Sequence, residues 1–129
     1  MPLMPDMPSS SVVAAAILKV RSLPESVQWY QHAGFQVRGG TPDADATWAE
    51  IERENLVLQL LSGETPWEGD PVFTGCFYVY TSSVDRVYSE VKDKIAVEWG
   101  VEERPWGSRE LTLTDPNGYF ITFCEFSTG

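Results

Sequence analysis

The sequence predicts an α+β fold made of two βαβββ modules, whose curled mixed sheets enclose a cleft. Two stretches of alternating side chains flank the turn Asp115–Gly118 near the C-terminus, which indicates a β-hairpin. The segment that ends in this hairpin repeats the order of elements of an earlier segment. Two modules that each carry a helix on one face of a sheet leave the opposite faces free to curl around a shared cleft.

The repeat keeps a nearly constant offset along the chain. Leu23 aligns with Val84 and Ala15 with Cys76, both 61 residues apart, and the offset grows to 63 residues near the ends of the modules. Self-similarity at a fixed period is the sequence signature of a duplicated structural unit. The predicted single domain spans residues 12–126, with module one over 12–62, a linker over 63–72 and module two over 73–126.

Module one is predicted to run strand, helix and three strands. An apolar run over residues 12–20 has strand length, and Ser22–Glu25 forms a capping box with proline in the first turn, so a helix begins at Leu23. Leu23, Val27 and Tyr30 give its buried stripe, and Gly34 is a C-terminal stop. Three strands are expected over residues 35–38, 47–52 and 56–61.

Module two repeats this order after a linker rich in proline and glycine. A strand is expected over residues 73–80, and Ser82 and Ser83 are candidate caps for the next helix. Apolar residues at helical spacing from Val84 to Val91 provide the buried stripe of that helix. A strand over residues 97–103 and the hairpin complete the module.

The final hairpin has two unlike faces. Leu111 and Leu113 share the expected core face with Ile121 and Phe123 on the second strand. The other face mixes polar and aromatic side chains, and this mixture suits the wall of a ligand pocket better than a plain solvent face. We expect the function on that second face.

Composition restricts the classes of partner. Nine lysines and arginines against nineteen aspartates and glutamates give a formal net charge of −10, a field that repels nucleic acid and favours a cationic partner. Ordinary solubility charge explains the acidity equally well. No segment reaches transmembrane length and no secretory signal is visible, so we expect no membrane partner, a disordered tail over residues 1–11, reduced thiols and a cytoplasmic location.

The chain resembles the vicinal oxygen chelate superfamily, which includes glyoxalases, extradiol dioxygenases and bleomycin-resistance proteins. Four segments carry the resemblance: Ile17–Tyr30, Ala33–Phe35, Pro105–Glu110 and Asp115–Gly118. The resemblance implies paired βαβββ modules, assembled as a homodimer whose sheets enclose two clefts.

The metal-dependent members take ligands from the first and last strand of each module. Carried over by position, these sites fall on Ala15, Gln59, Cys76 and Thr122. Alanine has no donor atom and neutral glutamine and threonine are weak ligands, while the only histidine, His32, lies near the end of the first predicted helix. We therefore expect no metal and no cofactor.

The resemblance then favours the bleomycin-resistance type, in which a homodimer sequesters a bulky aromatic or cationic antibiotic without catalysis. An aromatic face in a negative field selects a planar cation through stacking and cation–π attraction. Nine residues are the expected ligand contacts: Trp106, Trp48, Glu50, Gln59, Cys76, Tyr78, Glu110, Phe120 and Thr122.

Other interpretations stay open. Trp106 is equally a packing residue at a strand entry, Trp48 and Glu50 equally an exposed strand face, and Cys76 more often a small buried hydrophobe. A superfamily enzyme with an atypical metal or none would use Glu50 or Glu110 as acid or base and Cys76 as nucleophile. A module whose cleft is filled with side chains is the third alternative.

Overall fold

The computed structural model describes residues 15–40, 45–65, 67–73 and 75–126. Module one contains β1 (Ala15–Lys19), α1 (Leu23–His32), β2 (Gln36–Gly39), β3 (Trp48–Arg53) and β4 (Leu56–Leu61). Module two contains β5 (Cys76–Tyr80), α2 (Val84–Val91), β6 (Val97–Glu103), β7 (Ser108–Thr114) and β8 (Phe120–Phe126). The predicted α+β class and the duplicated βαβββ order are confirmed.

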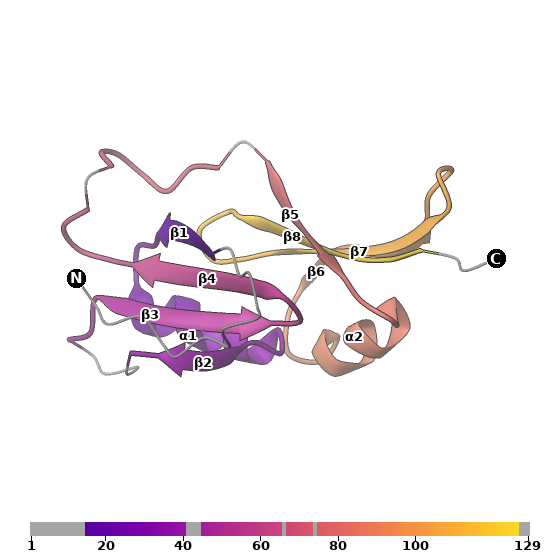
Figure 1. Cartoon of the computed structure of the whole chain (residues 1–129), viewed down its shortest axis with the longest axis horizontal. Coiled ribbons are helices and arrows are strands. Elements are labelled where there is room, and N and C mark those ends of the chain that lie inside the picture. Colours follow the sequence, from indigo (N-terminus) through magenta and orange to yellow (C-terminus); the bar gives the residue numbers. More distant parts are fainter. Residues whose placement is uncertain (1–14, 41–44, 66, 74, 127–129) are drawn as a thin grey trace, which may run out of the picture.

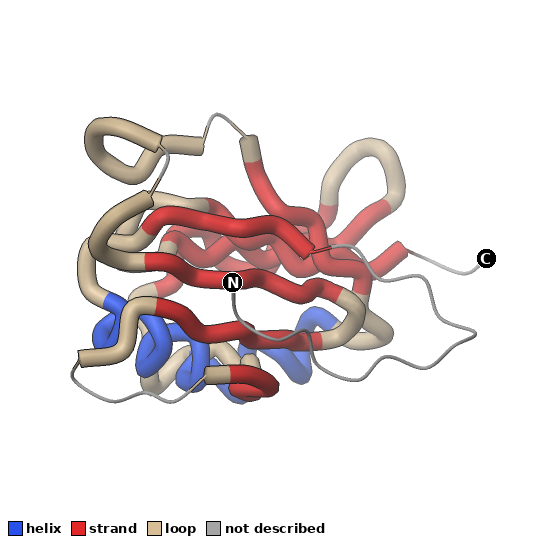
Figure 2. The backbone as a smooth tube through the Cα atoms, turned by 60° about the vertical axis from the view of Figure 1, so that its left-hand side comes forward, coloured by secondary structure: helices blue, strands red, loops and turns tan. Residues whose placement is uncertain are grey.

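Each module forms its own four-stranded mixed sheet. The strand orders are β1-β4-β3-β2 and β5-β8-β7-β6, with the first and last strand of each module parallel and the other neighbours antiparallel. The two sheets lie end to end along the long axis of the molecule (Figure 1). Both helices lie on one side of the molecule (Figure 2), which leaves the opposite face of each sheet, here called the helix-free face, without a helix.

The predicted helix caps are confirmed. Ser22 caps α1 by accepting a hydrogen bond from the Glu25 amide at 3.4 Å, and Ser83 caps α2 by accepting one from the Arg86 amide at 3.2 Å. Gly34 follows α1 with φ of +88°, a conformation that disfavours any residue with a Cβ. Local sequence therefore fixes where both helices begin and where α1 ends.

A single hydrophobic cluster spans both modules. Its members include the residues expected on the core faces, Leu58 and Leu60 in β4 and Leu111 and Phe123 in the final hairpin. All four are almost completely buried. Because these residues alternate along their strands, the remaining side chains of the same strands point to the helix-free face.

Strand β5 is shorter than the sequence predicts. A strand was expected over residues 73–80, but pairing with β8 begins at Cys76. Phe73 and Gly75 lie outside the strand, and the Phe73 ring stacks on Phe77 with ring centroids 4.8 Å apart. The expected start of the first strand at residues 12–14 and the tail over residues 1–11 lie outside the described residues.

The turn between β3 and β4 contains a strained residue. Glu54 has φ of +54° and is the one non-glycine with positive φ in the described part of the chain. This backbone conformation costs about 1–2 kcal/mol for a residue with a Cβ. Glycine avoids that strain but loses more conformational entropy on folding, which offsets about half of the gain. We expect Glu54→Gly to raise the free energy of unfolding by about 0.5–1 kcal/mol in urea titrations.

Glu54→Ala is the matched control for this substitution. It removes the carboxylate, whose oxygen lies 3.9 Å from Arg53 Nε, but keeps the backbone strain. An alanine variant as stable as the glycine variant would show that the charge, and not the backbone, limits stability at this turn.

Neither helix is a candidate membrane span. Within the described residues, both are too short and too polar to cross a bilayer.

Candidate functional site

The predicted ligand contacts fall into two groups on the helix-free faces. On the second sheet, Thr122 lies in the central strand β8, paired with Tyr78 in β5 and Thr112 in β7. On the first sheet, Gln59 takes the corresponding place in β4, paired with Ile17 in β1 and Glu50 in β3. The structure thus places the contacts as one half-site on each sheet.

A buried carboxylate organises the half-site on the second sheet. Glu110 is 4% exposed, and its Oε2 accepts hydrogen bonds from Ser108 Oγ at 2.7 Å, Tyr78 Oη at 2.9 Å and Trp106 Nε1 at 3.2 Å. Its other oxygen lies 3.5 Å from Arg104 Nε. The carboxylate therefore holds the polar ends of two aromatic side chains whose rings remain accessible, Trp106 at 61% and Tyr78 at 45%.

The same contacts set the acidity of this group. Burial raises the pKa of Glu110, but the hydrogen bonds from Ser108, Tyr78 and Trp106 outweigh it, and the pKa lies below the ordinary glutamate value. Desolvation and the hydrogen bond to Glu110 raise the pKa of Tyr78 to about 12. Near neutral pH the pair is thus a carboxylate and a neutral phenol, and proton transfer from Tyr78 is disfavoured.

This lowered pKa predicts an acid dependence of stability. A carboxyl group whose folded-state pKa is depressed stabilises the fold above its unfolded pKa and loses that contribution as pH falls through the folded pKa. We expect wild-type protein to lose stability in this acidic range and Glu110→Gln to lack that component. Urea unfolding from about pH 7 to about pH 3 measures it. Parallel pH profiles for the two proteins would contradict the prediction.

Module one carries a half-site of similar chemistry. Gln59 Nε2 donates to Glu50 Oε2 at 2.8 Å, and Gln59 Oε1 accepts from Trp48 Nε1 at 3.2 Å. Arg38 Nε lies 3.1 Å from the second oxygen of Glu50, a carboxylate that is only 2% exposed. Two side chains of the protein itself thus bond the Gln59 amide.

Aromatic rings surround the second half-site. Tyr80 and Phe126 stack with centroids 5.8 Å apart, and Tyr78 meets Tyr80 edge-on at 6.3 Å. Phe120 instead contacts Trp99 at 5.6 Å. These faces provide stacking surface for a flat ligand.

A chain of hydroxyl and thiol groups crosses the middle of the second sheet. Cys76 Sγ lies 2.9 Å from Thr122 Oγ1, which lies 2.8 Å from Thr112 Oγ1. Cys76 is exposed, so its interpretation as a small buried hydrophobe is wrong. Cys124 is buried, and burial followed by the charge of Glu110 raises the pKa of its thiol, which disfavours the reactive thiolate.

Sequence reasoning missed three members of the half-sites: Arg38, Arg104 and Ser108. Ser108 shares the parity of Glu110 in β7, so strand alternation could have identified it. The two arginines depend on tertiary placement. Arg109 in the same strand instead binds Asp85 of α2 through Nε at 3.1 Å and Nη2 at 2.9 Å.

The superfamily's metal positions do not supply a metal-binding set. Ala15 has no donor and pairs with Val57, one step along the face from Gln59, whose amide is already bonded to Trp48 and Glu50. Cys76 and Thr122 remain, and a divalent ion needs at least three good ligands. Within the described residues, no group of three or more histidine, cysteine or acidic side chains is placed to hold a metal.

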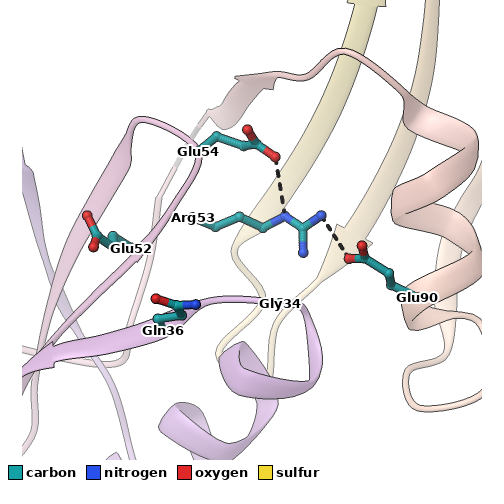
Figure 3. Close-up of a pocket in the computed structure, with 6 residues that line it drawn as sticks. All are labelled: Gly34, Gln36, Glu52, Arg53, Glu54 and Glu90. Atoms are coloured by element: carbon teal, nitrogen blue, oxygen red, sulfur yellow. Dashed lines mark ion pairs between the residues drawn. The ribbon is translucent and has the colours of Figure 1, made fainter.

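The molecule also has a polar hollow away from both half-sites. This hollow, of about 450 Å³, lies around Arg53 near the junction of the two modules, and Gly34 and Glu90 are among its lining residues (Figure 3). None of the nine predicted ligand contacts lines it.

Comparison with known proteins agrees with this architecture. Residues 12–123 match the family described as the glyoxalase/bleomycin resistance protein/dioxygenase superfamily. No curated protein matches the chain.

Solved structures share the fold at low sequence identity. TioX from Micromonospora sp. ML1 is 17% identical with a TM-score of 0.72, over 91% of this chain and 100% of that one. Lactoylglutathione lyase from Agrobacterium tumefaciens is 20% identical with a TM-score of 0.66, over 92% and 95%. A superfamily protein from Alicyclobacillus acidocaldarius is 16% identical with a TM-score of 0.71, over 95% and 96%. The chain belongs to the glyoxalase/bleomycin resistance protein/dioxygenase superfamily.

Proposed function

We propose that this protein is a non-catalytic, metal-free binding protein of the bleomycin-resistance type. It sequesters a bulky aromatic or cationic antibiotic-like molecule in the clefts of a homodimer. The observation that carries the proposal is the arrangement around Glu110, where one buried carboxylate holds the accessible rings of Trp106 and Tyr78.

This arrangement suits a planar cation. Because the indole N–H of Trp106 and the hydroxyl of Tyr78 both donate to Glu110, the faces of the two rings remain available for stacking. A cation over these faces gains cation–π attraction, and the nearby carboxylate and the net charge of −10 add a favourable field.

Accessible apolar side chains support the homodimer. Tyr80 and Phe126 are 63% and 50% exposed on the second sheet, where they stack on each other and Tyr80 meets Tyr78. Accessible apolar side chains that gather on one face typically mark an interaction site, and a second copy would cover them and turn two open half-sites into a closed cleft. The family description names bleomycin resistance among its members' functions, which is consistent with this proposal.

Native mass spectrometry and calorimetry with a bleomycin-type drug test the proposal. We expect a dimer without bound metal that gains the mass of the drug. Trp106→Ala should weaken binding at least about tenfold, because a central tryptophan usually dominates such a contact. Trp67→Ala, on the linker, is the matched control and should bind as wild type does.

Two results would contradict the proposal. The first is no detectable drug binding by a folded wild-type dimer. The second is one metal ion per protomer in protein purified without added metal, which would direct attention to enzymology.

A superfamily enzyme without a metal is the second candidate, and the exposed Cys76 favours it. Its thiol lies on the helix-free face within 2.9 Å of Thr122 Oγ1, where a bound substrate would meet it. Turnover of a substrate that Cys76→Ser abolishes, in a protein that binds no drug, would favour this function over sequestration.

A further inference from the structure

A second pocket lies between β1 and the linker, outside the two half-sites. Its cavity of about 260 Å³ is lined by β1, by residues 67, 68 and 70–73 of the connection from β4 to β5, and by Tyr119, and none of the nine predicted ligand contacts lines it. The connection from β4 to β5 runs above β1 in Figure 1. The sequence predicts a linker over residues 63–72, most of this segment.

Apolar side chains are unusually accessible at this pocket. Ile17, Trp67, Val72 and Phe73 all line it, and their exposed fractions are 47%, 47%, 79% and 44%. Scattered single exposed hydrophobic residues need no explanation, but several that converge on one cavity typically mark a binding site. These side chains therefore favour an apolar group as the occupant.

Lys19 holds the pocket in shape. Its ammonium group donates hydrogen bonds to the carbonyl oxygens of Gly69 at 2.6 Å and Trp67 at 3.1 Å. Tyr119, which also lines the pocket, donates from Oη to the Lys19 carbonyl at 2.7 Å. These contacts fasten the linker to β1, so the cavity is preformed, as small-molecule sites usually are.

The charge at the pocket is negative. Glu68 and Asp70 line it, and the one cationic side chain among its lining residues is Lys19, which is already bonded to two carbonyl groups. The rings of Trp67 and Phe73 add faces that attract a cation. An anionic ligand would meet repulsion here, whereas an amine would be attracted.

We propose that this pocket binds a small aromatic ring carried by a cationic amine, of the arylalkylamine class. An apolar cavity of about 150 Å³ holds benzene, so the larger volume here accommodates one ring with a short chain. The ring packs among Ile17, Trp67 and Phe73, and the ammonium group lies toward Glu68 and Asp70. The site is independent of the cleft function proposed above.

Two-dimensional NMR of the intact wild-type chain, titrated with 2-phenylethylammonium, tests the proposal. We expect saturable shifts of the Trp67 indole and Ile17 methyl signals. The isosteric anion 3-phenylpropionate should bind more weakly, and the double variant Glu68→Gln, Asp70→Asn should reduce that preference by up to about fivefold. Trp67→Ala should weaken binding at least about tenfold.

Trp106→Ala is the matched control, because it disrupts the proposed cleft site and should leave this pocket unchanged. Equal binding of the amine and the acid would overturn the proposal, as would wild-type affinity in Trp67→Ala. Shifts centred on Trp106 and Glu110 would assign the amine to the cleft instead. An absence of saturable shifts up to about 20 mM amine would reject the site, since an affinity weaker than this amounts to only a few kcal/mol of binding free energy.

Discussion

Replacement of Asp115 by alanine should lower the free energy of unfolding by about 4 kcal/mol, because it leaves several buried donors without a partner. Asp115 is 4% exposed. Its Oδ1 accepts the backbone amides of Asn117 and Tyr119, both at 2.8 Å, and its Oδ2 accepts Tyr30 Oη at 2.7 Å. Each unsatisfied buried group costs about 1–3 kcal/mol.

This carboxylate also joins the modules. Tyr30 belongs to α1 of module one, whereas Asp115 begins the turn between β7 and β8 of module two. Asn117 in the same turn donates to Ser26 Oγ at 3.1 Å and accepts from the Arg21 amide at 3.0 Å. Loss of Asp115 therefore weakens the turn and its docking on α1 together.

Asp115→Asn separates charge from hydrogen bonding in this turn. Burial raises the pKa of Asp115 above the ordinary value, and its hydrogen bonds, with Tyr30 first, offset this only in part. A raised carboxyl pKa gives stability that is fully present below the unfolded pKa and is lost as pH rises through the folded pKa. The asparagine variant keeps an acceptor for the two amides without a charge, so its loss should stay below about 2 kcal/mol.

Urea unfolding of the three proteins near neutral pH provides the measurement. Asp85→Ala is the control, because Asp85 is an exposed carboxylate paired with Arg109 and its removal should change stability little. An Asp115→Ala variant within about 1 kcal/mol of wild type would contradict the role assigned to this residue.

The Asp115–Gly118 turn shows which contacts local sequence predicts and which it does not. Proline and the Asn-Gly pair predict a reversal between two strands, and β7 and β8 pair as expected. Nothing local predicts that Tyr30, 85 residues earlier, donates to this turn, because that contact depends on how the modules pack. The sequence predicts the duplication because each module has its own pattern of apolar residues. The contacts between the modules depend instead on tertiary packing, which that pattern does not specify.

The half-sites show the same limit of prediction from local sequence. Strand alternation placed Trp48, Glu50 and Gln59 together, and the structure joins them through hydrogen bonds. Alternation could not predict that Arg38 lies beside Glu50, because β2 has a register irregularity between residues 37 and 39. Trp106 and Tyr78, whose rings are accessible, are among the predicted contacts, whereas Arg38 and Arg104, whose charges lie beside Glu50 and Glu110, are not.

Arg53 also links the modules. From the end of β3 its guanidinium donates to the Ala33 carbonyl at 3.1 Å, pairs with Glu90 of α2 at 3.0 Å and lies over the Phe123 ring at 5.2 Å. Figure 3 shows this side chain between Glu54 and Glu90, beside Gly34. Its side chain is only 9% exposed, whereas its partner Glu90 is 45% exposed at the edge of the hollow.

Gly34→Ala should lower the free energy of unfolding by about 3 kcal/mol, for two reasons. At φ of +88° the backbone conformation of any residue with a Cβ is strained by about 1–2 kcal/mol. The added Cβ would also overlap Arg53 Nη1, so the guanidinium must leave its place and lose its contacts with Ala33 and Glu90, at a further cost of about 1–2 kcal/mol.

Gly118→Ala separates these two costs in urea unfolding experiments. Gly118 has φ of +90° and no atom within 4 Å of an added Cβ, so its substitution carries the backbone strain alone. In an Arg53→Ala background the overlap at Gly34 disappears, and Gly34→Ala should then cost no more than Gly118→Ala does in wild type. The coupling between Gly34 and Arg53 is expected to be about 1–2 kcal/mol. A coupling near zero would mean that the displaced guanidinium finds equivalent partners elsewhere, and would contradict the cost assigned to the loss of its present contacts.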